Sequence, residues 1–264
     1  MPLVLRLFLT EMRRDLRMWW SYRLDTLGWI ALWAIGFPLT MLIFDSVTGG
    51  YGPEHQLASW IGFLVWDLCM GALATATQEV AREAREGTLE SVILSPFSPV
   101  LMFWLRIVAL FVRQALQTLL LGIILALVLR LPVRIASPVP MLLALTVLSI
   151  SGLSLALGGL TLVYKHIDSL VGIITLLSVL FTGALVPLNS LGPVFQLLKY
   201  LLPTTWGIDA LRGNILHGST WSSLAADGTL LGLGVQAAVF LLLGAFIFKW
   251  GFSRAQLQGS LGAY

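Results

Sequence analysis

Residues 78–96 read Gln-Glu-Val-Ala-Arg-Glu-Ala-Arg-Glu-Gly-Thr-Leu-Glu-Ser-Val-Ile-Leu-Ser-Pro and form a polar island in an otherwise apolar chain. Glu79 and Glu83 lie four residues apart, and so do Arg82 and Glu86, a spacing that places such side chains on one helix face. The apolar helix before the island is therefore expected to continue to about Arg85 with an exposed, ion-paired face. Gly87 then permits a sharp turn, because glycine tolerates backbone conformations that other residues avoid.

The second half of the island predicts another short helix. Thr88 can cap a helix from Leu89 to Leu94, and Glu90 lies near its positive end. Ser95-Pro96 ends it, since the residue before proline avoids helical geometry. The island is thus predicted to be a helical hairpin just outside a membrane, although a charged run of this kind is also typical of a plain solvated loop.

The composition excludes a water-soluble fold. Of the 264 residues, 58% are hydrophobic and 11% are charged, whereas soluble domains carry roughly 25% charged residues. We treat residues 1–264 as a single transmembrane domain. The one cysteine, Cys69, permits no intrachain disulfide, and the net charge of +3 does not indicate a nucleic-acid partner, because the basic residues are spread along the flanks of the apolar stretches.

The first apolar pattern, in residues 1–24, predicts an amphipathic helix from Leu3 to Tyr22. Its apolar side chains recur at three- and four-residue steps. Such a helix lies in the membrane interface with arginines toward anionic lipid and tryptophans at headgroup level. The residues predicted to contact this interface are Arg13, Arg14, Arg17, Trp19 and Trp20.

Six further stretches are long enough to cross a bilayer, for which a helix needs about 20 apolar residues. The expected spans are Leu27–Phe44, Leu57–Thr77, Val100–Leu129, Val139–Val163, Ser169–Val186 and Thr229–Lys249. The predicted fold is therefore an all-α membrane protein with an interface helix and six transmembrane helices. Most Lys and Arg residues near the span ends lie on the side of the island, which places the island and both termini in the cytoplasm.

Residues 187–228, between the last two spans, are too apolar for a plain external loop. Val194–Leu202 is a short hydrophobic stretch, and Thr204-Thr205-Trp206 leads into a helix expected to end near Gly213. Apolar pieces of 10 to 14 residues are typical of re-entrant or interfacial segments. We predict two short helices dipping into the outer leaflet, with an ordinary capping loop as the alternative.

Polar residues inside the predicted spans need partners, because a lone charge at this depth costs several kcal/mol. Asp67 lies near the centre of the second span and Arg113 well inside the third. We hypothesise that they form an ion pair, within one subunit or across a dimer. Arg106 is expected to extend to the inner headgroups, and Gln117 to line a wet cavity or join helices.

The fourth span carries small residues at spacings that let helices approach closely. These residues are Ser151, Ser154, Gly158 and Gly159. Small side chains at a helix surface allow the backbone of a neighbouring helix to come near. We therefore predict that they pack against another span.

Residues 83–96, Glu-Ala-Arg-Glu-Gly-Thr-Leu-Glu-Ser-Val-Ile-Leu-Ser-Pro, resemble the cytoplasmic loop of the type-two permease family of ATP-binding cassette (ABC) exporters. In that family the Glu-Gly-Thr-Leu-Glu and Ser-Pro elements lie in the loop that carries the coupling helix, which docks on a separate ATPase subunit. The span count, the leading amphipathic helix and the late Pro-Thr-Thr-Trp…Leu-Arg segment are similar too. The residues that the resemblance assigns to ATPase coupling are Glu79, Arg82, Glu83, Arg85, Glu86, Gly87, Thr88, Leu89 and Glu90.

The resemblance implies that a separate partner subunit supplies the ATPase activity. The chain lacks a Gly-x-x-x-x-Gly-Lys-Ser/Thr phosphate loop, so we expect no enzyme activity and no cofactor in it, with ATP and Mg used by the partner. The three histidines show no metal-ligand spacing. Expected partners are two copies of an ABC ATPase, a second copy or close paralogue of this chain, and lipids of a plasma membrane, here a bacterial inner membrane.

The predicted function is export of an amphipathic or hydrophobic, drug- or lipid-like substrate from the cytoplasm or inner leaflet. Export of a lipid-linked glycan by the same mechanism is the alternative. An ATP-independent transporter or channel is a further one, although such proteins often carry matched broken helices or clustered charges at mid-membrane. A membrane enzyme would need a catalytic grouping that the sequence does not show.

Overall fold

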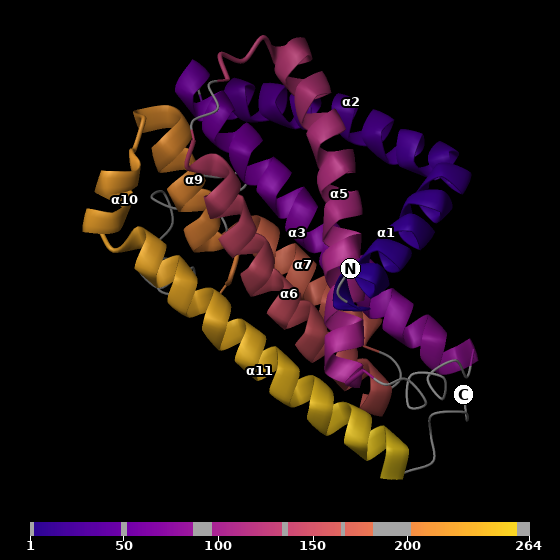
Figure 1. The fold of residues 1–264 in the computed structure, drawn as a ribbon. Coiled ribbons are helices and arrows are strands. Elements are labelled where there is room, and N and C mark those ends of the chain that lie inside the picture. Colours follow the sequence, from indigo (N-terminus) through magenta and orange to yellow (C-terminus); the bar gives the residue numbers. More distant parts are fainter. Residues whose placement is uncertain are drawn as a thin grey trace.

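The computed structural model describes residues 3–48, 52–86, 97–133, 137–164, 167–181 and 202–257, and in these ranges it is helical throughout, without strands (Figure 1). The helices in order are α1 (Leu3–Ser21), α2 (Arg23–Thr48), α3 (Pro53–Glu86), α5 (Pro99–Leu129), α6 (Val139–Tyr164), α7 (Asp168–Phe181), α9 (Thr205–His217), α10 (Trp221–Ala226) and α11 (Thr229–Leu257). The predicted amphipathic helix and the predicted all-helical class are confirmed.

Five of these helices are long and apolar enough to cross a membrane: α2, α3, α5, α6 and α11. Each contains one of the predicted spans. The remaining predicted span, Ser169–Val186, coincides with α7, which is a shorter apolar helix over its described residues. Residues 182–186 lie outside the described part, so the sixth crossing remains a prediction.

Helices α6 and α11 run side by side in the same direction and touch backbone to backbone (Figure 1). A Cβ atom placed on Gly152 would lie 2.4 Å from the carbonyl carbon of Phe240, and one on Gly251 would lie 2.1 Å from the Gly159 oxygen. Glycine at these positions permits this contact, because a side chain would collide with the facing backbone. The close packing predicted for the fourth span is confirmed at Gly159.

Helix α3 is at the centre of the bundle and contacts α5, α6, α7 and α9. Its Phe63 ring packs against Trp33 and Phe37 of α2, with ring centroids 4.8 and 4.7 Å apart. On another side, the Trp66 indole donates a hydrogen bond to Ser178 Oγ of α7 at 3.0 Å. Any displacement of α3 therefore affects most of the other spans.

Helix α9 packs on α3 and α6 at the end of the bundle where those two helices begin. Arg212 Nε donates to the Ala58 carbonyl of α3 at 2.9 Å, and a Cβ atom on Gly207 would lie 2.0 Å from Thr146 Oγ1 of α6. The helix predicted after Thr204–Trp206 is thus present. It continues beyond Gly213 to His217, because Gly218 supplies the left-handed conformation (φ 67°) that ends it.

Short helix α10 follows α9 and was not predicted from the sequence. Its first turn is stabilised by the Thr220 backbone N–H, which donates to Ser223 Oγ. The earlier hydrophobic piece, residues 194–201, lies outside the described part. The re-entrant arrangement of the whole 187–228 segment therefore remains a prediction.

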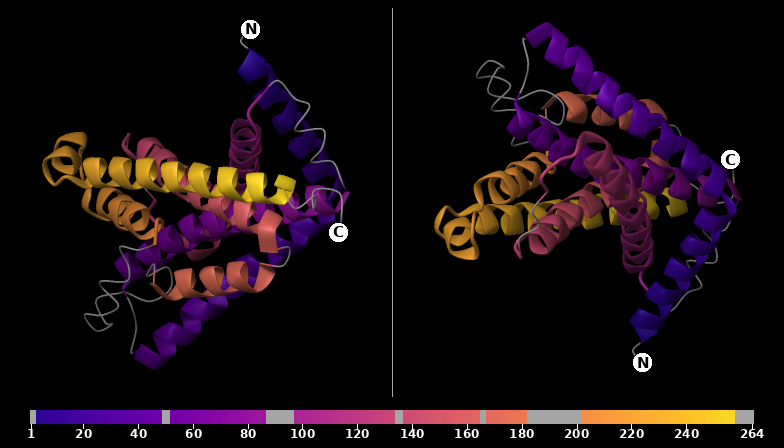
Figure 2. Two further views of the ribbon diagram at one scale, coloured as in Figure 1. Left: turned by 90° about the horizontal axis from the view of Figure 1, so that it is seen from below. Right: turned by 90° about the horizontal axis from the view of Figure 1, so that it is seen from above.

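Helices α1 and α2 meet at a sharp corner, and α1 then lies along α5 (Figures 1 and 2). Much of the α2 surface is apolar and exposed, with Leu24 at 80% and Ile35 at 71% exposure. Such a surface is suited to lipid or to another membrane protein chain.

Candidate functional site

The polar stem at the end of α3 is the first part of the site. Helix α3 has 34 residues and is about 50 Å long at about 1.5 Å per residue, whereas the hydrocarbon layer is about 30 Å thick. The helix is therefore longer than the layer is thick, and its charged last residues, 78–86, are the part suited to lie outside it. The predicted coupling residues Gly87, Thr88, Leu89 and Glu90 lie outside the described part.

One face of the stem carries the predicted ion pairs. Arg82 binds Glu79 and lies 3.9 Å from Glu86. Arg85 and Glu86 are exposed. The predicted ion-paired face is confirmed at these positions, and it presents both signs of charge to a partner.

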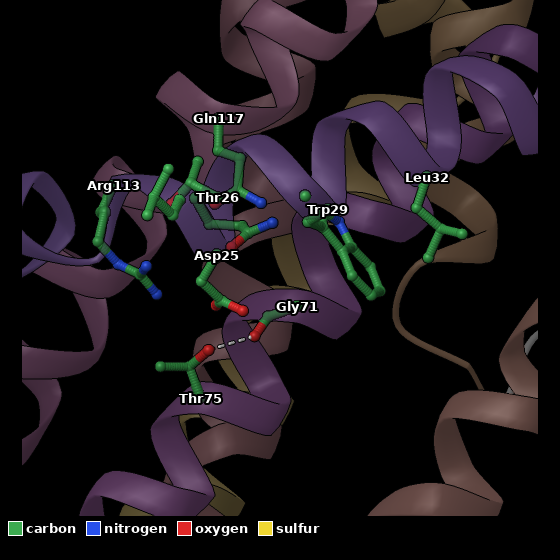
Figure 3. Close-up of a pocket in the computed structure, with 11 residues that line it drawn as sticks. Asp25, Thr26, Trp29, Leu32, Gly71, Thr75, Arg113 and Gln117 are labelled. Carbon is green, nitrogen blue, oxygen red and sulfur yellow. Dashed lines mark hydrogen bonds between the residues drawn. The ribbon is translucent and has the colours of Figure 1, made fainter.

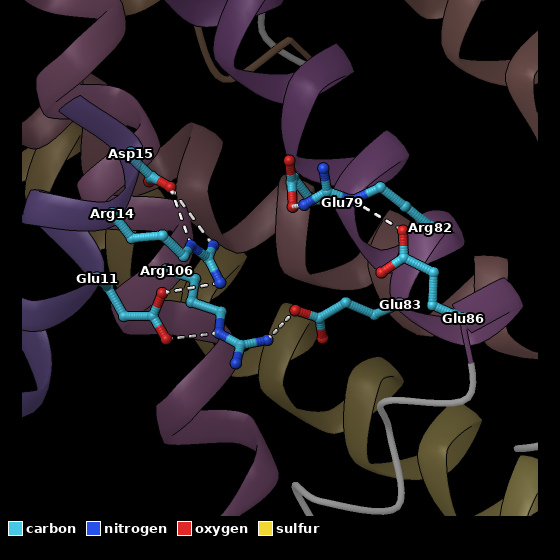
Figure 4. Close-up of polar contacts among 8 residues, drawn as sticks. All are labelled: Glu11, Arg14, Asp15, Glu79, Arg82, Glu83, Glu86 and Arg106. Carbon is cyan, nitrogen blue, oxygen red and sulfur yellow. Dashed lines mark hydrogen bonds and ion pairs between the residues drawn. The ribbon is translucent and has the colours of Figure 1, made fainter. Parts of the chain in front are cut away.

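Glu83 does not belong to that exposed face. It is buried, and its carboxylate accepts a hydrogen bond from Arg106 of α5 (Figure 4). Arg106 Nε also donates to Glu11 Oε1 of α1 at 2.9 Å. The expectation that Glu83 lies on the exposed face is wrong. The Arg106 guanidinium is held between two carboxylates, and its position at the level of the headgroups remains a prediction.

The side of α1 that faces the bundle is acidic. Glu11 and Asp15 lie four residues apart on this face, and both are buried. Arg14 contacts both carboxylates, at 3.2 and 3.4 Å. Burial raises the pKa of Asp15 above its ordinary value, and the positive charges of Arg14 and Arg113 oppose this rise.

Trp20, predicted at headgroup level, is exposed.

The charged contact among α1, α3 and α5 was not predicted from the sequence, and we call it the Arg106 cluster (Glu11, Glu83 and Arg106). A usable signal was present. Glu11 and Asp15 are four residues apart, and Arg106 and Arg113 are seven apart, so each pair shares one face of its helix. Two acidic positions facing two basic ones would have predicted that α1 packs on α5.

Asp67 is satisfied by neutral donors and not by Arg113. It accepts hydrogen bonds from Trp29 Nε1 at 3.1 Å, from Thr118 Oγ1 at 2.5 Å and from Gln114 Nε2 at 3.5 Å. The ion pair predicted within one subunit is therefore wrong. Gln114 and Thr118 share the α5 face toward α3, while Arg113 is turned about 100° from Gln114. The alternative, a pair across a dimer, remains a prediction.

Arg113 instead lines a polar cavity of about 400 Å³ among α2, α3 and α5 (Figure 3). A second cavity of about 320 Å³ lies next to α1 and the stem. The residues that line both cavities are Asp25, Thr26, Thr75 and Arg113. Gln117 lines the larger cavity, as one of its two predicted roles requires. The two cavities are therefore neighbours, one beside the stem and one at the middle of α5.

These features define a multi-pass α-helical membrane protein with a polar stem and a polar cavity among α2, α3 and α5. A family model described as ABC-2 type transporter matches residues 7–216, from α1 through most of α9. The chain belongs to this family and is the transmembrane subunit of an ABC transporter. Permeases of the family normally pair with an ATPase subunit. A comparison with curated proteins finds no match.

Proposed function

We propose that this chain is the membrane subunit of an ATP-driven exporter and that its α3 stem receives the motion of a separate ATPase. The observation that carries the proposal is the continuity of α3. One uninterrupted helix, Pro53–Glu86, contains Asp67 in its buried part, Thr75 at the cavity and the exposed Glu86 at the stem. A force on the stem would therefore act directly on a wall of the cavity.

The direction of the helices supports six crossings with the stem and both termini on one side. Helices α6 and α11 are adjacent and parallel, so the chain between them has to return across the bundle, and α7 lies on that return path. The start of α5 and the end of α11 line one pocket through Pro99 and Phe252. The stem immediately precedes α5, which puts the end of α11 on the cytoplasmic side in our proposal.

The proposed substrate is amphipathic or hydrophobic, because the cavity has polar walls and adjoins the exposed apolar surface of α2. Export of a lipid-linked glycan would use the same chain. In this proposal two copies, or one copy and a close paralogue, assemble with two ATPase subunits in a bacterial inner membrane. ATP and Mg are used by the ATPase and not by this chain.

Co-purification tests the ATPase contact. The chain would be tagged in its native host, extracted gently and examined for a stoichiometric P-loop ATPase. Glu86 and Glu90 would be changed to Lys. The matched control would change two exposed acidic residues at the other end of the bundle, Glu54 and Asp227, to Lys. We expect the ATPase with wild type and with the control but not with E86K/E90K.

Absence of an ATPase from the well-folded wild-type preparation would contradict the proposal and favour an ATP-independent transporter or channel. Retention of the ATPase by E86K/E90K would contradict only the proposal that the stem and island dock the ATPase, and not the exporter proposal as a whole. Size-exclusion chromatography of each variant separates a lost contact from a lost fold.

A further inference from the structure

Arg113 is the cation in the cavities whose charge is not neutralised by direct contact. Among the residues that the structure describes, it makes no hydrogen bond and no ion pair within 4 Å. Arg82, the other cation that lines the smaller cavity, is bound to Glu79. A guanidinium inside a membrane protein costs free energy when it has no partner. We therefore expect water or an anionic group beside Arg113.

Asp15 presents the opposite charge to the same space. It lines the smaller cavity and is only 1% exposed, and its Oδ2 atom has no hydrogen-bond partner among the described residues. Asp25, in the first turn of α2, lines both cavities. Buried polar atoms are normally hydrogen-bonded, so the unpartnered Asp15 oxygen indicates a donor that the described residues do not supply.

The charges around the cavities favour a ligand that carries both signs. Glu79 and Arg82 neutralise each other, and Arg14 contacts Asp15 through Oδ1 only, which leaves the Arg113 cation facing Asp25 and the unpartnered Oδ2 atom of Asp15. A purely anionic ligand would meet the two acids, and a purely cationic one would meet Arg113 at close range. A ligand with a separated anion and cation avoids both repulsions.

An apolar surface continues from the larger cavity along α2. Leu24 and Leu32 line the cavity and are 80% and 59% exposed. Trp29 lines it too (Figure 3), and its indole N–H donates a hydrogen bond to Asp67. Because α2 is a candidate membrane span, an alkyl chain attached to the ligand would lie beside α2 at the depth of the lipid tails.

We propose that these two neighbouring cavities together bind the headgroup of a zwitterionic amphiphile, with a phosphate at Arg113, an ammonium group toward Asp15 and Asp25, and the alkyl chain along α2. This inference rests on the proposed function for the idea that the chain handles amphiphiles, but binding itself needs no ATPase. The same headgroup chemistry is found in a transported substrate and in a resident bilayer lipid.

Calorimetric titration of the purified full chain in an uncharged maltoside detergent tests the binding. The probes are dihexanoyl phosphatidylethanolamine, which is zwitterionic, dihexanoyl phosphatidylglycerol, which is anionic, and dodecyltrimethylammonium, which is cationic. We expect the zwitterionic probe to bind about tenfold more tightly than either other probe, because it adds one charge-assisted contact to each.

Two variants separate the contributions of the two charges. Arg113→Gln is expected to weaken binding of the zwitterionic probe about tenfold, through loss of the phosphate contact. Asp15→Asn is expected to remove the preference for the zwitterionic over the anionic probe. Arg130→Gln, at the exposed far end of α5, is the matched control and should bind like wild type. Unchanged binding by R113Q, or equal binding of the anionic probe by wild type, would overturn the proposal.

A vesicle assay with the partner ATPase then identifies the source of the ligand. ATP-driven movement of a fluorescent phosphatidylethanolamine that is lost in R113Q identifies a transported substrate. Binding that is lost in R113Q while ATP-driven transport of another amphiphile persists identifies a resident lipid. The calorimetric result is independent of the ATPase, so failure of the exporter proposal and failure of the binding proposal are distinguishable.

Discussion

The contact between α6 and α11 and the contact of α1 with α5 and α3 are formed by different chemistry. Gly152 and Gly159 of α6 meet the α11 backbone with no intervening side chains. At the Arg106 cluster, by contrast, long charged side chains bridge the helices. A backbone contact fits in one register only, whereas flexible ion-pairing side chains can follow a shift or change partners. We interpret α6–α11 as the fixed part of the subunit and the Arg106 cluster as the contact that adjusts when the stem moves.

Gly251→Leu should have the largest effect on this comparison. Its Cβ would lie 2.1 Å from the Gly159 oxygen, and overpacking a filled interior typically costs about 1–3 kcal/mol, with more expected where backbone must move. We expect little folded protein in fluorescence-detected size exclusion. Gly234→Leu, on the same helix with open space around it, should remain folded. Equal yields of the two variants would show that α6 and α11 separate easily.

Arg106→Gln should have the next largest effect, because it removes the cation that joins buried Glu83 to buried Glu11 and leaves Arg14 as the cation beside Glu11. Breaking a buried ion pair from one side costs about 3–5 kcal/mol, which would appear as a lower unfolding temperature. The triple variant E11Q/E83Q/R106Q should recover much of that loss, because it removes the uncompensated charges. No recovery would mean that the cluster is held by packing and not by charge.

Asp67→Leu tests whether the charged contact extends to the middle of the membrane. It should cost about 1–3 kcal/mol, because the Trp29 and Thr118 donors lose their acceptor. A double-mutant cycle of D67L with R113Q should give a coupling energy below about 0.5 kcal/mol, as for sites without shared contacts. A larger coupling would restore the ion pair that the sequence suggested, in a different conformation or across a dimer.

The smallest effect is expected from the protonation of Asp15. Burial raises its pKa in the folded protein, so between the ordinary and the raised pKa the folded state binds more protons than the unfolded state. The free energy of unfolding should therefore fall as the pH rises through this window. Asp15→Asn should flatten that part of the pH profile, measured as unfolding temperature against pH. A profile identical to wild type would show that Asp15 is not buried in solution.

Much of the architecture was predictable because it depends on local patterns. Apolar stretches of sufficient length marked the α2, α3, α5, α6 and α11 spans, and the amphipathic repeat marked α1. At the stem, Arg82 and Glu86 are paired as their four-residue spacing indicates. These features need only the periodicity of one helix and the thickness of a bilayer.

The predicted site was less accurate, because it depended on contacts between helices. Asp67 and Arg113 were both identified as charged residues inside predicted spans, but they were predicted to form an ion pair with each other. In the structure, Asp67 is held by neutral donors and Arg113 faces a cavity. The prediction for the stem was wrong for a similar reason at Glu83, whose position on α3 turns it toward α5 and not toward solvent.

By itself the sequence determined that this is a multi-pass helical membrane protein, where its long apolar helices lie, and where its polar stem begins. Only the tertiary structure decided that Arg106 joins Glu11 to Glu83 and that Arg113 remains in a polar cavity. The physical reason is rotation. Neighbouring residues on a helix point about 100° apart, so the partner of each side chain depends on how the helices are turned against one another, and hydropathy does not encode that angle.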